Sequence, residues 1–431
     1  MEVRIKRNNI INDIILYLFF TLVVGLFLFG KAFSYINFKF IGLPVYITEL
    51  FLIFTIIFIF VNSIFLRDGK LFINYNQRVE FLLFYIIFII SLVRGLISYR
   101  DIVFTLRQSA IIYYSIFYFL VPIILDNFKK IKIYFSFLVI CTSILVLVIL
   151  FGVNIGELGG FYYYYYVSMS LIFLIFYPLL IKKPVLKFFS YSLILVHLAI
   201  ILLSKVRAAW IGILMGILFI IYMFFRIPVM RKDLKKILLL GMLGFLVLAI
   251  ILPVFLIFYP SSIEDIKNEF MSIYNFRDMT TVSAANARWR LMAWSDYVNK
   301  SLEKPLFGHG FGKVFMPETL VKEIDWSPPK GEDWVDPHNS YLSILFRTGV
   351  IGLIIFFIII FRFFKLSIKF IKECDNERIR IYVASLLTII IVILGISFFD
   401  VVLERPFFGI FLWINMGLVI SLIKIKKKQT K

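Results

Sequence analysis

Apolar runs of about 20 residues dominate this chain, and a helix needs about that length to cross the hydrocarbon core of a membrane. Hydrophobic residues make up 61% of the 431 positions, and the mean hydropathy is +0.96. Soluble domains carry a smaller apolar share, so the composition excludes a soluble globular protein. We predict an all-α polytopic membrane protein with about twelve spans, at residues 11–30, 42–66, 80–99, 103–125, 131–153, 161–181, 186–204, 208–226, 235–259, 339–361, 379–399 and 402–423.

The net charge of +20 could suggest a nucleic-acid partner, but the distribution of the charge predicts a membrane topology instead. Every second connection between spans is rich in lysine and arginine, as the positive-inside rule requires of cytoplasmic loops. The basic segments include Arg4–Arg7, Lys129–Lys132, Arg226–Lys236 and Lys424–Lys428. Both termini are therefore expected in the cytoplasm. Residues 260–337 hold nine basic and twelve acidic residues, a net charge of −3, so we expect this segment outside.

The cysteine and histidine content argues against a disulfide or a metal centre. Cys141 falls within a predicted span and Cys374 in a basic loop, so we do not expect them to pair. The three histidines are scattered, and no metal-ligand spacing occurs, so we expect no metal and no cofactor. The first apolar stretch is too long for a cleavable signal peptide and lacks a small-residue cleavage site. We expect it to remain as an anchor.

The domain prediction has three parts. Residues 1–259 form nine spans, residues 260–338 form a catalytic outer loop with short helices, and residues 339–431 form three spans and a basic tail. Within the loop a helix is expected from about Ser283 to Leu302, with Arg290, Trp294 and Tyr297 on one face. Pro305 ends that helix, and three glycines between 308 and 312 predict a tight turn.

Several cations fall on the outer face, where the topology rule disfavours them. A guanidinium group can grip phosphate in a bidentate fork, so we interpret these cations as ligands of a pyrophosphate head group. Arg107 and Arg405 also lie on this face. The candidates for pyrophosphate binding are Lys205, Arg207, Arg288 and Arg290.

Each candidate also has a structural interpretation. Arg207 could reach lipid phosphates, and Arg288 or Arg290 could lie on a solvated helix face. His338 could cap the tenth span, and Asp336 could orient the His338 ring or be ordinary loop charge. For His309 and His197 we favour structural roles, and for the run Tyr162–Tyr166 an aromatic belt at the membrane interface.

Four motifs resemble those of the O-antigen ligase and O-antigen polymerase superfamily, most strongly over residues 200–355. Ser204–Ala209 is similar to the family's Ser-x-Arg-small turn, with Val206 inserted. Asn286–Trp294 is similar to its Trp-Arg-Leu-x-x-Trp helix, and Pro305–Gly312 to its glycine turn. His338–Leu342, followed by Gly349–Gly352, resembles its His-Asn-x-x-Leu entry helix.

The resemblance implies a GT-C-type membrane glycosyltransferase of the bacterial inner membrane, with its active site on the periplasmic side and a glycan on undecaprenyl pyrophosphate as donor. Reaction would proceed with inversion. An imidazole, whose unperturbed pKa is about 6.5, suits the general base that takes the acceptor's proton. We assign that role to His338, with Asp336, Asn339 and Trp294 in support.

The acceptor and the reaction class remain open. A ligase would use a sugar hydroxyl of the lipid A-core, and a polymerase would use a second lipid-linked repeat; the single outer loop and the Trp-Arg helix favour the ligase. A lipid-linked glycan transporter is a third possibility, since buried charge is common in transporters. Against it, the polar residues gather on one face and no repeat is evident.

Overall fold

The computed structural model describes residues 2–40, 43–66, 77–99, 101–150, 162–204, 206–237, 239, 282–319 and 335–429. Lys205, nearly all of the predicted span 235–259 and parts of the outer loop lie outside the described residues. Within the described ranges, nine helices are long and apolar enough to cross a membrane, or ten if one bent pair counts as a span. The chain is an all-α multi-pass membrane protein, as predicted.

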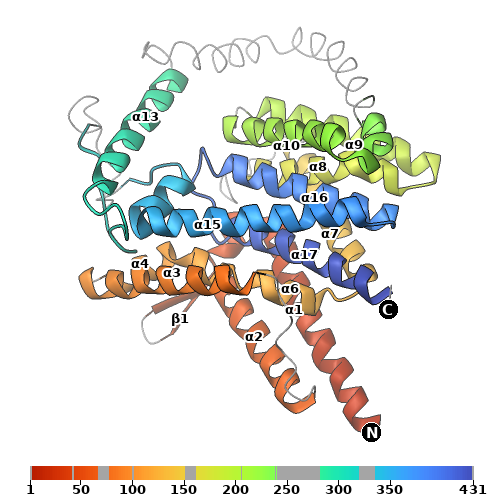
Figure 1. Ribbon diagram of the computed structural model, residues 1–431, viewed down its shortest axis with the longest axis horizontal. Helices are drawn as coiled ribbons and strands as arrows, with labels where there is room; N and C mark the ends of the chain where they lie inside the picture. Colours follow the sequence, from red (N-terminus) through yellow and green to blue (C-terminus); the bar gives the residue numbers. More distant parts are fainter. Residues whose placement is uncertain are drawn as a thin grey trace.

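The described elements follow one another as a series of helices with one small hairpin (Figure 1). They are α1 (Glu2–Ser34), β1 (Asn37–Phe40), β2 (Leu43–Tyr46), α2 (Ile47–Leu66), α3 (Arg78–Ser98), α4 (Ile102–Gln108), α5 (Ala110–Tyr114), α6 (Phe117–Ile124), α7 (Phe128–Leu150), α8 (Tyr163–Leu180), α9 (Pro184–Leu203), α10 (Arg207–Arg226), the 3-10 turn η2 (Pro228–Met230), α13 (Val282–Ser301), α15 (Ser340–Glu373), α16 (Glu377–Ile396) and α17 (Gly409–Gln429).

Helices α16 and α17 form the centre of the bundle. Their apolar windows are 94% and 89% buried inside the protein, because residues on every side of these helices are apolar. Helix α16 packs against α8 and α10, and α17 packs against α6. Gly212 and Gly216 of α10 face α16; a β-carbon at Gly212 would lie 2.8 Å from the Ile396 side chain. Small residues thus allow the close helix contact that membrane bundles use.

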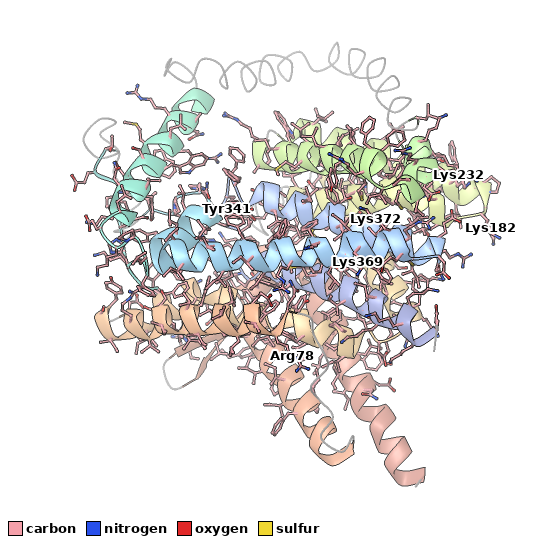
Figure 2. All side chains as sticks on the ribbon, viewed as in Figure 1. Arg78, Lys182, Lys232, Tyr341, Lys369 and Lys372 are labelled. Carbon is pink, nitrogen blue, oxygen red and sulfur yellow. The ribbon has the colours of Figure 1, made fainter. Side chains whose placement is uncertain are left out.

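Four lysines of the predicted cytoplasmic connections lie toward one end of the bundle. In Figure 2, Lys182, Lys232, Lys369 and Lys372 lie toward the right of the molecule, and Tyr341 lies toward the left. Both chain termini are also at the right in Figure 1. This arrangement is the one that the alternating basic loops predict, with the start of α15 and the outer-loop helix α13 at the opposite end.

Two predicted spans begin differently from the prediction. The second was expected at 42–66, but Leu43–Tyr46 pairs with Asn37–Phe40 as an antiparallel hairpin, and α2 begins at Ile47. Its carboxylate at Glu49 accepts the Tyr46 N–H at 2.9 Å. The last span was expected at 402–423, but α17 begins at Gly409, because Glu404 and Arg405 form ion pairs with residues of another segment.

The fourth predicted span, 103–125, is broken. Helix α4 and the helical residues 110–124 meet at Ser109 with a bend of 46°. The Asp101 carboxylate caps α4 by accepting the Phe104 N–H at 2.8 Å, and the Ser109 hydroxyl donates back to the Leu106 carbonyl at 2.8 Å. The break turns Arg107 toward the Tyr46 ring of the hairpin, and it turns Gln108 toward the glycine turn, where its side-chain oxygen accepts the Gly312 N–H at 2.8 Å.

The glycine turn of the outer loop is held directly against α15. Gly308 and Gly349 both have positive φ, of 63° and 70°, and a β-carbon at Gly308 would lie 2.5 Å from the backbone of Arg347 and Gly349. The His309 N–H donates to the Phe346 carbonyl at 2.8 Å, and the Val350 N–H to the Pro305 carbonyl at 2.8 Å. These bonds fix the loop at the end of the bundle where His338 lies.

Candidate active site at the start of α15

His338 stands directly before α15 with an unusual backbone. Among the described residues it is the one non-glycine residue with positive φ, 46°, a region in which histidine is tolerated better than most side chains. Its Nδ1 lies 3.7 Å from an Asp400 carboxylate oxygen, and its ring meets the Trp289 ring edge-on at 5.3 Å between centroids. The His338 side chain is 37% exposed.

Asp400 is the buried partner of this histidine. Tyr165 donates its hydroxyl to the carboxylate at 2.9 Å, and the Val401 N–H donates to it at 2.8 Å. Burial raises the pKa of Asp400, but the nearby His338 ring, the Arg405 charge and the Tyr165 hydroxyl together outweigh burial and hold that pKa below its usual value. The ionised carboxylate favours the proton on Nδ1 of His338, which leaves Nε2 as the acceptor.

Asn339 performs the capping function that His338 could have had. Its side-chain oxygen accepts the N–H groups of Tyr341 at 2.9 Å and Leu342 at 3.1 Å, which makes it the N-cap of α15. Ser340 then ties this first turn to the 397–408 segment, since its hydroxyl donates to the Asp400 carbonyl at 2.9 Å. His338 therefore does not cap α15, and its ring lies next to Asp400.

Asp336 pairs with Arg405 and not with His338, whose ring it was considered to orient. Its carboxylate forms an ion pair with Arg405, whereas Asp400 occupies the position beside the His338 ring. Asp400 directly follows the predicted span 379–399, but the sequence gave no reason to pair it with a histidine 62 positions earlier. A charged residue at the end of a predicted span was the signal available.

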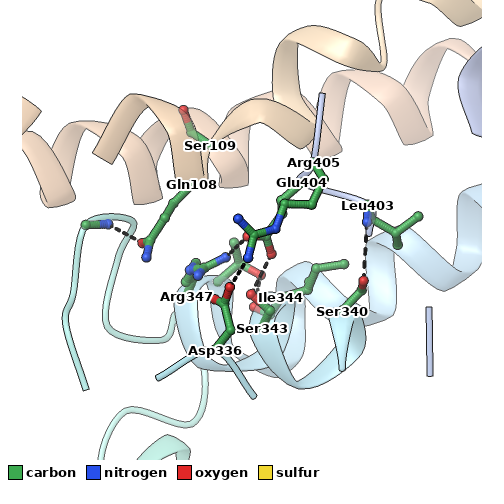
Figure 3. Close-up of polar contacts among 12 residues, drawn as sticks. Gln108, Ser109, Asp336, Ser340, Ser343, Ile344, Arg347, Leu403, Glu404 and Arg405 are labelled. Atoms are coloured by element: carbon green, nitrogen blue, oxygen red, sulfur yellow. Dashed lines mark hydrogen bonds and ion pairs between the residues drawn. The ribbon is translucent and has the colours of Figure 1, made fainter. Parts of the chain in front are cut away.

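Figure 3 shows the Asp336–Arg405 pair and, beside it, the buried pair Arg347–Glu404, which sequence reasoning missed. Arg347 and Ser343 of α15 both contact Glu404, and Asp336 contacts Arg405. Arg347 is 4% exposed and Glu404 7%, so neither charge would be tolerated there without its partner. The pairs bind the 397–408 segment to the entry of α15.

The predicted helix of the outer loop is confirmed as α13. Two of its side chains hold the residues directly before His338 in place. Trp294 donates its indole N–H to the Pro337 carbonyl at 2.6 Å, and Tyr297 donates its hydroxyl to the Val335 carbonyl. Trp294 also packs against Phe399, with ring centroids 6.0 Å apart. Both side chains fix residues 335–337, and thereby the position of the histidine that follows.

The predicted pyrophosphate ligands come from two helices. Arg207 is the first residue of α10, and Arg288 and Arg290 lie in the first half of α13; all three are half-buried. The charge of Arg290 acts on the Tyr165 hydroxyl, which itself contacts Asp400. Lys205 lies outside the described residues.

The other two histidines have structural contacts, as we favoured. His197 is fully buried, with Nδ1 2.8 Å from the Leu193 carbonyl and Nε2 3.4 Å from the Ser170 hydroxyl. His309 places Nε2 2.8 Å from the Lys300 carbonyl, and burial lowers the pKa of His309. Among the described residues, no group of three or more His, Cys, Asp or Glu side chains is arranged to hold a metal ion.

The prediction of an interfacial belt for Tyr162–Tyr166 is wrong. Tyr163, Tyr165 and Tyr166 are at most 1% exposed, and the rings of Tyr165 and Tyr166 pack inside the protein against Phe408. The Tyr165 and Tyr166 hydroxyls donate to Asp400 and to the Phe407 carbonyl, which satisfies polar groups that lipid could not. Tyr165 and Tyr166 thus hold in place the segment that carries Asp400.

Comparison with known proteins agrees with this location. Residues 191–357 match the family described as O-antigen ligase, and the match includes α10, α13 and the start of α15. A protein named as a polysaccharide ligase in Rickettsia bellii is 36% identical over 84 residues, which are 19% of this chain and 20% of that protein. Similarly named proteins of Rickettsia typhi and Rickettsia conorii are each 30% identical, over 108 and 100 residues. The matched segments thus span only about a quarter or less of these relatives' length.

Proposed function

We propose that this chain is a membrane glycosyltransferase of the O-antigen ligase type, which the family match over residues 191–357 supports. It transfers a glycan from undecaprenyl pyrophosphate to a hydroxyl group of a lipid A-core sugar. The reaction takes place on the periplasmic face of the bacterial inner membrane, with both termini in the cytoplasm. No cofactor or metal is assigned to it.

The observation that carries the proposal is the pairing of His338 with Asp400 at the membrane-entry end of α15. The 3.7 Å separation is longer than a hydrogen bond, and such catalytic contacts often tighten when substrate binds. An ionised Asp400 keeps the Nδ1 proton in place and stabilises the imidazolium that forms during the reaction. Nε2 of His338 is then free to accept the proton of a sugar hydroxyl.

In the proposed step, the acceptor oxygen attacks the anomeric carbon from the face opposite the pyrophosphate. The new carbon–oxygen glycosidic bond forms as the bond to the pyrophosphate oxygen breaks, and the acceptor proton moves to Nε2 of His338. Undecaprenyl pyrophosphate leaves with the bonding electron pair. Arg207, Arg288 and Arg290 are assigned to its developing negative charge.

A polymerase reaction, with a second lipid-linked repeat as acceptor, uses the same donor chemistry. It remains the alternative, and the product distinguishes it from the ligase, because only a polymerase joins two lipid-linked repeats. A transporter is the less favoured class. Transport would not release undecaprenyl pyrophosphate, whereas transfer requires that release.

The test uses full-length protein in proteoliposomes with a purified lipid-linked glycan, and it measures undecaprenyl pyrophosphate release. His338→Ala should lose rate by about 10²- to 10⁴-fold, the usual contribution of general-base catalysis, while it still binds donor. The control Lys304→Gln changes an exposed residue of the same loop and should keep the wild-type rate. A His338→Gln enzyme with near-normal turnover would remove the base assignment and leave a positioning role.

A further inference from the structure

A cavity of about 120 Å³ lies beside the ion pairs at the start of α15, and the proposed chemistry makes no use of it. Its walls come from the β1–β2 hairpin, the broken helix α4–α5 and the 404–406 segment. One water molecule needs only about 10–15 Å³ of such space, so the cavity can admit a larger polar ligand. Asp336 and Arg405, which line it, connect it to the active site.

Arg107 has an unusual setting in this cavity. Its guanidinium lies over the Tyr46 ring at 4.8 Å and the Tyr35 ring at 5.1 Å from the centroids. Within the described part of the chain, no carboxylate forms an ion pair with it, and its side chain remains exposed. The two rings hold the guanidinium in place, and its N–H groups can donate to a ligand.

The rest of the lining offers acceptors and a balanced charge. Glu49 is held by the Tyr46 N–H at 2.9 Å and by the Tyr113 hydroxyl at 3.1 Å. Three arginines of the lining, at 107, 347 and 405, are matched by Glu49, Asp336 and Glu404. A pyrophosphate would prefer an excess of positive charge. Equal numbers of planar donors and acceptors beside tyrosine rings suit a neutral ligand with many hydroxyl groups.

We propose that this cavity binds the acceptor, as a neutral sugar ring whose hydroxyl groups contact Arg107 and Glu49. This proposal rests on the proposed transferase function for its assignment to the acceptor. The cavity reaches the reaction centre through Asp336, two residues before His338, and through Arg405. The arginines assigned to the donor are on α10 and α13, and the cavity is lined from the hairpin and α4 instead, on the other side of α15 (Figure 1). Donor and acceptor would then approach His338 from different sides.

Binding can be tested without knowledge of the natural acceptor. The probes are the methyl glycosides of glucose, galactose, mannose and N-acetylglucosamine, with methyl glucuronide as the acidic counterpart. Full-length protein in lipid nanodiscs is titrated with each probe, and binding is followed by saturation-transfer NMR. Wild type should bind at least one neutral glycoside, and Arg107→Gln and Glu49→Gln should weaken that binding by roughly 10- to 100-fold.

Lys39→Gln is the matched control, because Lys39 is an exposed cation of the same hairpin outside the cavity lining. It should bind the glycosides as wild type does. Tyr113→Phe removes one donor to Glu49 with little change of shape, so it tests the site if the charge variants fail to fold; it should also weaken binding. Undecaprenyl pyrophosphate, titrated separately, should bind all of these variants as it binds wild type.

Three results would overturn the proposal. They are no binding of any neutral glycoside by wild type, tighter binding of the glucuronide than of every neutral probe, and loss of undecaprenyl pyrophosphate binding in Arg107→Gln. Failure of the proposed function is a separate result. If His338→Ala kept normal transfer while Arg107→Gln still lost glycoside binding, the sugar site would stand and the general base would not.

Discussion

Substitution of Asp400 by asparagine is the sharpest test of the active site, because it removes one charge and little volume. Two unit charges 3.7 Å apart interact by about 4.5 kcal/mol at an effective dielectric constant of ~20. The imidazole carries roughly half a charge when the proton is partly transferred, which halves this value to about 2 kcal/mol. Each ~1.4 kcal/mol is tenfold in rate, so about 2 kcal/mol corresponds to a loss of about 30-fold. Exposure of 37% of the His338 side chain screens the pair, so this value is an upper estimate.

The assay is release of undecaprenyl pyrophosphate in proteoliposomes, measured between pH 5.5 and 8. Burial raises the pKa of Asp400, but His338, Arg405 and Tyr165 together hold that pKa below its usual value, so Asp400 stays ionised throughout this range. Protonation of Asp400 therefore cannot cause a fall in rate at its acidic end. The rate loss of Asp400→Asn relative to wild type should therefore be present across this whole pH range.

Two comparisons make this prediction refutable. Glu303→Gln removes an exposed carboxylate of the same loop and should leave the rate unchanged. His338→Ala/Asp400→Asn should be no slower than His338→Ala, because residues that act as a unit are not additive. Wild-type turnover by Asp400→Asn, or additive losses in the double variant, would show that Asp400 does not act through His338.

Two further predictions concern the donor and the topology. Arg207→Lys and Arg288→Lys should each impair turnover, because a lysine point charge cannot reproduce the bidentate fork; wild-type activity in both would exclude bidentate recognition. A thiol engineered at Glu318 should be labelled by an impermeant reagent from outside the cell, and one at Lys232 should not, with the buried Cys141 and Cys374 unreactive in both. The reverse pattern would place residues 260–337 in the cytoplasm and contradict the location of the active site.

The sequence predicted the helical architecture because that information is local. A run of about 20 apolar residues specifies a spanning helix without reference to any other segment, and α3, α7, α10 and α16 occur within a few residues of their predicted positions. The outer-loop helix followed from the same kind of evidence, a periodic polar face ended by Pro305. His338 was found because a titratable residue at a membrane entry is rare.

The errors occur where a segment's structure depends on a distant partner. The apolar run at 42–66 was assigned to one span, yet its first residues pair with Asn37–Phe40 across a turn. Glu404 and Arg405 were placed inside the last span, yet Arg347 and Asp336 hold them outside its helix. Hydropathy sums over a window and contains no information on which charge neutralises which.

Asp400 shows why the same limit applies to the chemistry. Its partners Tyr165 and His338 come from α8 and from the start of α15, so no spacing in the sequence could join them. The fold brings them together because Ser340 bonds to the Asp400 carbonyl and Asn339 caps α15, which leaves His338 in its left-handed backbone conformation next to the carboxylate. The structural elements around His338 thus favour the tautomer with its proton on Nδ1, and they give the proposed base a defined orientation.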